Sequence, residues 1–224
     1  MENKSFLAKL VDNKKIVIGS MIFALIYALI YGIGLSYAVG GNPITHTISM
    51  IGRSTILGRF PTLFVFFGIV TNISLLLNIN YAYNREGFIN TKAGKIGNIC
   101  AYIGVLCLTI CTLIPSIEFD EVVDVKTTFQ VIGHWSGALL FGVFFAISIC
   151  IYLLMERKKY KYFLTTFIAF VTLLAGLVIS IFFLPNNKNG LVEIVPICLA
   201  MLIMIFVNAD VYPKLSPPTE TDNN

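Results

Sequence analysis

His134 is the residue whose type and position most suggest chemistry. It stands near the start of an apolar segment, about 131–155, and a short stretch rich in acidic residues precedes that segment. A histidine in this place could act as a general base, a metal ligand or a proton carrier. Asp120 or Asp124 would then orient the imidazole, as a membrane-embedded lipid hydrolase or acyl-transfer enzyme would require. The alternative is an interfacial histidine held by one hydrogen bond.

Motifs that would specify a reaction or a metal are missing from the sequence. It contains no GxSxG, P-loop or dinucleotide-binding pattern. The other histidine, His46, does not form an HxxxH or HExxH pair with His134, and there is no CxxC motif. The cysteines all lie in apolar runs, where a thiol packs as a small hydrophobic group. We therefore expect no metal and no cofactor.

Polar residues on one side of the predicted membrane suggest a lipid site instead. Arg53 and Arg59, in the loop after the first apolar run, would bind an anionic lipid headgroup through charge and hydrogen bonds. Glu193 stands near the start of the last apolar run, one turn before Pro196. It would either line a polar cavity or extend to the membrane surface. The predicted lipid-binding residues are His46, Ser49, Arg53, Arg59, His134 and Glu193.

The elements that must position these residues are membrane spans. The chain is 57% hydrophobic and 12% charged, whereas soluble domains carry about 25% charged residues. Six apolar runs approach or exceed the roughly 20 residues that a helix needs to cross the hydrocarbon core. They are residues 16–39, 60–83, 96–114, 131–155, 162–184 and 191–209. The sequence therefore predicts an all-α polytopic membrane protein with six transmembrane helices in one bundle.

The positions of lysine and arginine predict the orientation of this bundle. They concentrate in the N-terminal segment and in the loops 84–95 and 156–161, and cytoplasmic loops are the ones rich in these residues. Both termini are therefore expected in the cytoplasm. The predicted organisation is a cytoplasmic segment over 1–15, a transmembrane domain over 16–211 and a disordered cytoplasmic tail over 212–224.

Other residues predict packing rather than chemistry. Asn72, Ser74, Asn78 and Asn80 lie within the second run, and interhelical hydrogen bonds explain such residues without a transported substrate. Small-residue pairs in the fourth run predict close helix packing, and they would also allow a homo-oligomer. These pairs are Gly133-x₃-Gly137 and Ala138-x₃-Gly142.

The first outer loop is expected to contain a helix that lies on the outer leaflet. Asn42-Pro43 can start a turn, or a helix at Pro43 that would place Ile44, Ile48 and Ile51 on one apolar face.

Two short stretches resemble a known family. Ile48-Ser49-Met50-Ile51-Gly52, followed by an aromatic-rich second run, resembles the IS-x-x-G signature in the first lumenal loop of the DRAM family. That family comprises damage-regulated autophagy modulators and relatives that act in GPI-anchor lipid remodelling. The stretch from His134 to Phe141, HWSGALLF, resembles the histidine and glycine-alanine signature at the start of its fourth helix. The resemblance covers about residues 15–210 and implies six spans with cytoplasmic termini.

The chain also departs from that family and shares features with others. Met50 stands where the family usually has an acidic residue, and Arg53-Ser54 replaces a common Pro-Glu. Related prokaryotic six-helix families show the same general pattern.

The leading hypothesis is a non-enzymatic multi-pass membrane protein that binds or organises lipid at the exoplasmic leaflet. The alternatives are the enzyme built on His134 and a small transporter or channel. Membrane lipids are the expected partners, and the cell membrane is the expected location, with an endomembrane as the alternative. No basic run is interleaved with aromatic residues, so nucleic-acid binding is not expected.

Overall fold

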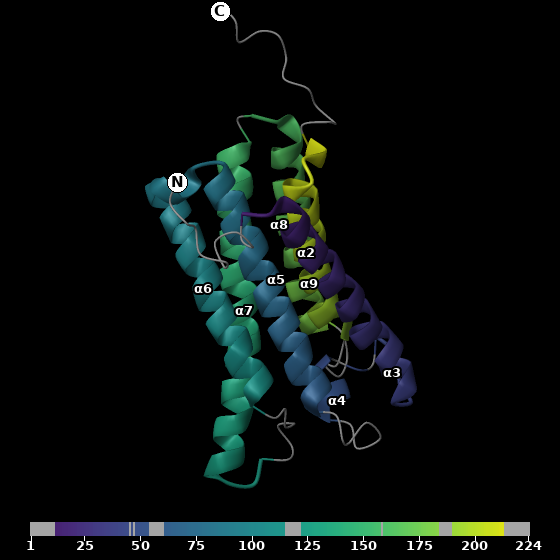
Figure 1. The fold of residues 1–224 in the computed structure, drawn as a ribbon. Coiled ribbons are helices and arrows are strands. Elements are labelled where there is room, and N and C mark those ends of the chain that lie inside the picture. Colours follow the sequence, from purple (N-terminus) through teal and green to yellow (C-terminus); the bar gives the residue numbers. More distant parts are fainter. Residues whose placement is uncertain are drawn as a thin grey trace, which may run out of the picture.

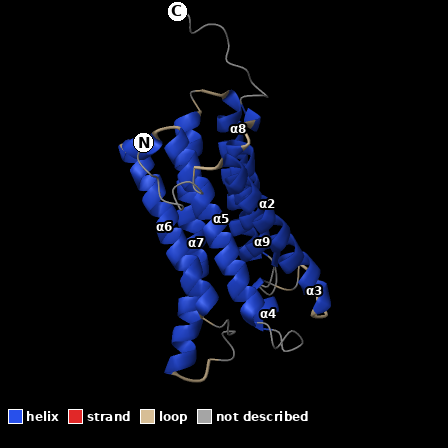
Figure 2. Cartoon of the chain, viewed as in Figure 1, coloured by secondary structure: helices blue, strands red, loops and turns tan. Residues whose placement is uncertain are grey.

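Helices make up all the regular structure of the described residues (Figure 2). The computed structural model describes residues 12–44, 46, 48–53, 61–114, 122–157, 159–183 and 190–212. The predicted all-α class is therefore confirmed. Arg59 and Asp120 lie outside the described residues, and for Arg53 only the backbone is described.

The helices form one elongated bundle (Figure 1). In chain order they are α2 (Lys14–Leu29), the π-helical η1 (Ile30–Gly34), α3 (Leu35–Ala38), α4 (Ile48–Arg53), α5 (Pro61–Arg85), the 3₁₀ helix η2 (Phe88–Asn90), α6 (Lys92–Leu113), α7 (Val125–Glu156), α8 (Lys161–Phe183) and α9 (Gly190–Asn208).

Five helical segments in the described part of the chain are long and apolar enough to cross a membrane. They are Lys14–Ala38, Leu63–Arg85, Lys92–Leu113, Val125–Glu156 and Gly190–Asn208. The shorter apolar segment Tyr162–Gly176 lies within α8. The chain is therefore an apolar helical bundle of the kind found in integral membrane proteins.

Both ends of the described chain lie at the same end of the bundle, which we call the terminal end. The ammonium group of Lys14, at the start of α2, pairs with the carboxylate of Asp210, just after α9. The turns between α5 and α6 and between α7 and α8 also lie there (Figure 1). Helices α3 and α4 lie at the opposite end, which we call the α4 end.

Side-chain caps fix the starts of three helices, α2, α6 and α7. The Asn13 carboxamide accepts from the backbone N–H of Lys15 at the start of α2, and Thr91 caps α6. At the start of α7, Asp124 and Thr127 form a reciprocal capping box. Hydrogen bonds from the Thr127 backbone and hydroxyl lower the pKa of Asp124 below its usual value.

Helices α6 and α7 form the most extensive pair in the bundle. A Cβ on Gly137 would lie 2.9 Å from the carbonyl oxygen of Cys107, so the two backbones approach closely there. A Cβ on Gly104 would lie 2.5 Å from the ring of Phe145. The predicted packing role of the Gly133-x₃-Gly137 pair is thus confirmed at Gly137, within a single chain.

Polar residues of α5 donate hydrogen bonds to neighbouring helices, as predicted. The pairs are Asn72 with Thr109 (3.0 Å), Ser74 with the Ser20 carbonyl (3.0 Å), Asn78 with the Val17 carbonyl (2.8 Å) and Asn80 with Tyr102 (3.2 Å). Asn208 of α9 also donates to the Asn78 side chain, at 2.8 Å. These bonds join α5 to α2, α6 and α9.

Ion pairs connect four helices at the terminal end. Besides the Lys14 pair, Asp210 accepts from Arg85 at 2.9 Å, and Arg85 donates to Glu86 at 2.8 Å. Lys159 in turn contacts Glu86 at 2.6 Å.

The first residue of the predicted disordered tail belongs to the packed bundle. Tyr212 is buried, and its ring stacks on Phe163 with the ring centroids 4.3 Å apart. The residues after 212 lie outside the described part of the chain.

The expected helix on the outer leaflet differs in its start and its surroundings. Pro43 and Ile44 form a turn, which is one of the two alternatives that the sequence predicts there, and the helix begins at Ile48. Ile44 is exposed. Ile48 and Ile51 are 4% and 1% exposed, because α4 packs beneath the bundle instead of lying on a surface.

Candidate functional site

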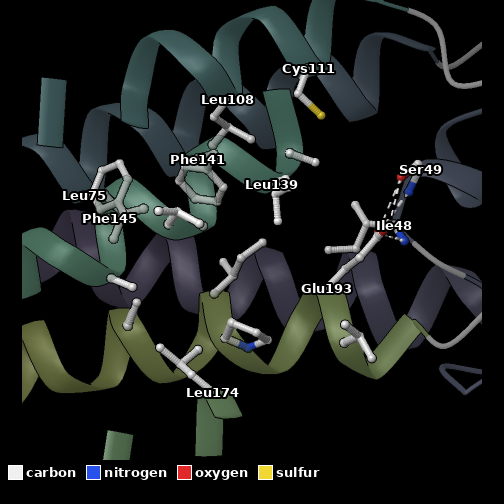
Figure 3. A pocket seen from close by; sticks show the side chains of 18 of the residues that line it. Ile48, Ser49, Leu75, Leu108, Cys111, Leu139, Phe141, Phe145, Leu174 and Glu193 are labelled. Atoms are coloured by element: carbon white, nitrogen blue, oxygen red, sulfur yellow. Dashed lines mark hydrogen bonds between the residues drawn. The ribbon is translucent and has the colours of Figure 1, made fainter. Parts of the chain in front are cut away.

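A lateral groove of about 360 Å³ extends from α4 along the bundle. Its walls come from α4, α5, α6, α7, α8 and α9 (Figure 3). Volumes of about 300–1,000 Å³ are usual for pockets that hold small molecules. The size is therefore sufficient for a ligand.

Apolar side chains form nearly all of the groove wall. Leu75, Phe141 and Phe145 lie together at the end away from α4 (Figure 3). Leu139 also lines the groove and yet is 68% exposed, and the neighbouring Val143 is exposed as well. The groove therefore opens on the flank of the bundle, along α7.

The groove has room beside α7 because the residues of this helix that face it there are small. Ala138 and Gly142 line it, and a Cβ added to Gly142 would meet no atom within 4 Å. The predicted packing role of this second small-residue pair is therefore not found inside the bundle. Gly137 packs against α6, whereas the next face of the same helix borders empty space.

Glu193 and Ser49 form the polar end of the groove. A Glu193 carboxylate oxygen, Oε2, accepts hydrogen bonds from the backbone N–H groups of Ile48 at 2.8 Å and Ser49 at 3.4 Å. The Ser49 hydroxyl donates to Oε1 at 3.2 Å. Figure 3 shows these bonds at one end of the apolar wall. Two of the predicted lipid-binding residues are thus brought together, and their contact joins α4 to the start of α9.

His46 lies near this polar end but is not a groove-lining residue. A Cβ on Gly41 would overlap the His46 ring, and a Cβ on Gly190 would overlap the His46 carbonyl oxygen. The backbone N–H of Gly190 also donates to the Ile44 carbonyl at 3.2 Å. The loop around His46 therefore packs on the first residue of α9 and fixes where that helix begins.

His134 serves the α6–α7 contact rather than the groove wall. It is 2% exposed, and its Nδ1 lies 2.9 Å from the carbonyl oxygen of Cys111 and 3.0 Å from that of Ile114. Both partners can only accept, so Nδ1 carries the proton and donates to them. The imidazole thereby donates to carbonyl groups at the C-terminal end of α6, which have no N–H partner within the helix.

The predicted histidine–carboxylate pair is not assembled in the described residues. Asp124 precedes His134 on the same helix by about 15 Å of axial rise, and its carboxylate is engaged in the capping box. The residue next to the imidazole is Cys111, whose sulfur lies 3.8 Å from Nδ1. No group of three His, Cys, Asp or Glu side chains in the described ranges could hold a metal ion.

The apolar extension of the groove along α7 was not predicted from the sequence. Leu139 and Val143 look like any lipid-facing residues of an apolar helix, and only the packing of α8 and α9 makes them part of a groove. The spacing of Ala138 and Gly142 predicts helix packing rather than a groove. Comparison with protein-family models, curated proteins and solved structures found no match.

Proposed function

We propose that this chain is a multi-pass membrane protein that holds the acyl chain of a membrane lipid in the lateral groove. The observation that carries the proposal is an apolar groove that opens on the flank of a membrane-type bundle and ends at a polar pair, Glu193 and Ser49. A lipid has the same division, with a long apolar chain and a polar head. The protein is then a binding or organising protein rather than an enzyme.

The length of the groove supports an acyl chain as the occupant. Trp135 and Ile149 both line it, and they are separated by about 21 Å along α7. One leaflet of the hydrocarbon core is about 15 Å thick, half of the full core. A chain from a single leaflet would therefore find apolar wall along its whole length.

The preference of the groove for one lipid over another would have to come from its shape and from its polar end. Lipid tails are already in apolar surroundings, so moving one into the groove brings no hydrophobic gain of the kind found in water. Close packing against Phe141 and Phe145 and hydrogen bonds at Glu193 would have to supply the preference. A groove of this kind would be filled by the abundant lipids around it.

The membrane topology is also part of the proposal. We place six spans in the membrane, with α8 as the fifth, and both termini in the cytoplasm of a cell-membrane protein. The lysines and arginines near the terminal end support this orientation. The groove's polar end would then lie at the exoplasmic side, where Ser49 and Glu193 were predicted to act.

The resemblance to the DRAM family remains a proposal that rests on the two short motifs. In this chain their residues have physical roles. Ser49 donates to Glu193, His134 satisfies the end of α6, and Ala138 and Phe141 line the groove. The transporter alternative gains no support, because Asn78 and Asn208 bond to each other inside the bundle.

Lipid retention in a groove-filling variant tests the proposal. Gly142→Leu adds a side chain to the groove wall where a Cβ meets no atom, and leucine is a better helix former than glycine. Gly176→Leu in α8 is the matched control, because Gly176 is also exposed and free of neighbours within 4 Å but does not line the groove. Native mass spectrometry of the purified proteins would count the retained lipids.

We expect Gly142→Leu to lose a tightly held lipid that both the unmodified protein and Gly176→Leu keep. Equal lipid retention in all three proteins would contradict the proposal.

A further inference from the structure

We propose that the lateral groove selects amphiphiles whose head group donates hydrogen bonds, above all a long-chain amine or amino-alcohol, through the carboxylate of Glu193. The inference rests on the proposed lipid-binding function and specifies the ligand class. It differs from the sequence-based expectation of an anionic headgroup held by Arg53 and Arg59, which stays a prediction because Arg59 and the Arg53 side chain lie outside the described residues.

Both carboxylate oxygens of Glu193 accept hydrogen bonds from their partners in the protein. Oε2 receives the backbone N–H groups of Ile48 and Ser49, which can only donate. The Ser49 hydroxyl uses its single proton on the same carboxylate. A carboxylate oxygen offers about two acceptor positions, and one of those on Oε1 remains for a donor from a ligand.

Charge points to the same ligand class. Glu193 is the charged residue among the described residues that line the groove. The ion pairs of Lys14, Arg85 and Lys159 lie at the terminal end, at the other end of the bundle. The backbone and hydroxyl groups that donate to Glu193 are neutral, and a negative charge beside apolar walls is costly unless a positive group also accompanies it. A ligand ammonium would supply that group, whereas a phosphate or carboxylate head would be repelled.

The position of Glu193 along the bundle suits a head group. It follows Gly190, the first residue of α9, by about 4.5 Å of axial rise. The apolar wall then continues toward Ile149 and Ala200, away from the α4 end. A ligand with its head at Glu193 therefore directs its chain into the groove, with the head at the level of the membrane surface.

The single tryptophan provides a direct readout. Trp135 lines the groove and is the chain's only tryptophan, so a quencher on a bound chain reports occupancy through its fluorescence. The probes are nitroxide-labelled octadecylamine, octadecanol and octadecanoic acid, added to the purified full chain in neutral detergent at pH 7. Gly142→Leu keeps the tryptophan and fills the groove, so its quenching gives the background from probe in the micelle.

We expect groove-specific quenching with the amine at a concentration about tenfold lower than with the acid, since a charge-assisted hydrogen bond is replaced by like-charge repulsion. The alcohol should fall between them. In Glu193→Gln the difference between amine and acid should shrink to about threefold or less, because the amide still accepts from Ile48 but carries no charge.

The possible results separate this inference from the proposed function. If the acid quenches as well as the amine in the unmodified protein, the head-group inference is overturned while the groove still binds a chain. This comparison needs no variant at Glu193. If none of the probes quenches more in the unmodified protein than in Gly142→Leu, the lipid-binding function itself fails, and the inference with it.

Discussion

The Glu193 carboxylate accepts a hydrogen bond from the backbone N–H of Ile48 at 2.8 Å, although the two residues are 145 positions apart in the sequence. This bond joins the start of α9 to the start of α4 and forms the polar end of the lateral groove. One side chain thus holds the short helix in place and presents a carboxylate to any ligand in the groove.

Removing this carboxylate should destabilise the bundle at the α4 end. In Glu193→Ala the N–H groups of Ile48 and Ser49 lose their acceptor, and an unsatisfied buried donor costs about 1–3 kcal/mol of unfolding free energy. Denaturant unfolding in detergent would measure the loss. Glu193→Gln keeps one acceptor oxygen, so its loss should be clearly smaller. Equal losses for the two variants would show that the hydrogen bond to Ile48 contributes little.

His134 should prove structural. In His134→Ala the carbonyls of Cys111 and Ile114 lose their donor and a buried ring is removed, so unfolding free energy should fall by about 1–3 kcal/mol. Thermal unfolding in detergent is the measurement, with His134→Gln as the variant that retains an N–H donor. An unchanged unfolding transition combined with a loss of lipid binding would instead make the histidine a functional residue.

Two glycines of α7 should respond oppositely to the same change. A Cβ on Gly137 would lie 2.9 Å from a backbone oxygen of α6, so Gly137→Ala should cost about 1–3 kcal/mol through overpacking. Gly142→Ala places its methyl group in open space and should leave stability equal or raised by up to about 1 kcal/mol. Parallel unfolding measurements compare them. A similar loss at both positions would argue against the open groove beside Gly142.

The ion pairs at the terminal end should make stability depend on pH. Burial alone would raise the pKa of Glu86, but hydrogen bonds from Lys159 and Arg85 outweigh it and lower this pKa. Because the pKa of Glu86 is lower in the folded than in the unfolded chain, its ionised form stabilises the fold at pH values above the unfolded pKa of about 4.3. This stabilisation is lost as the pH falls through the folded pKa.

Lys159 shows the opposite dependence. Burial would lower its pKa, but hydrogen bonds to Glu86 and Glu156 raise it. Its contribution is present below about pH 10.4 and is lost as the pH rises through the raised folded value. The free energy of unfolding, measured from pH 3 to pH 11, should therefore fall at both ends of this range. Glu86→Gln should reduce the fall in unfolding free energy at low pH. A fall of the same size in this variant would contradict the role given to Glu86.

The helical class and the interhelical hydrogen bonds could be predicted because they depend on local pattern. Long apolar runs require helices in lipid, and amides such as Asn78 inside a run must find partners on neighbouring helices. The bond between Glu193 and Ile48 could not be predicted, since neither position carries a signal that identifies the other. The start of α4 was misplaced for the same reason, because its first N–H groups are satisfied by a distant residue rather than by a local cap.

The apolar wall of the groove escaped prediction because it has the composition of an ordinary lipid-facing helix. Leu139 is exposed and also lines the groove. Hydropathy does not distinguish an apolar residue that faces lipid from one that lines a groove. Even Gly142, which stands beside the open space, has the same sequence spacing as the packing glycines.

The central claim is that the lateral groove holds a lipid acyl chain. The most direct measurement is photo-cross-linking of the unmodified protein in lipid nanodiscs with an amino-alcohol lipid that carries a diazirine in its chain. Peptide mass spectrometry then maps the adducts. We predict that adducts at Leu139 and Ile197, which line the groove, exceed those at the exposed residues Ile168 and Leu202, and that this excess disappears in Gly142→Leu. Adducts spread evenly over both pairs, and unchanged in that variant, would contradict the account.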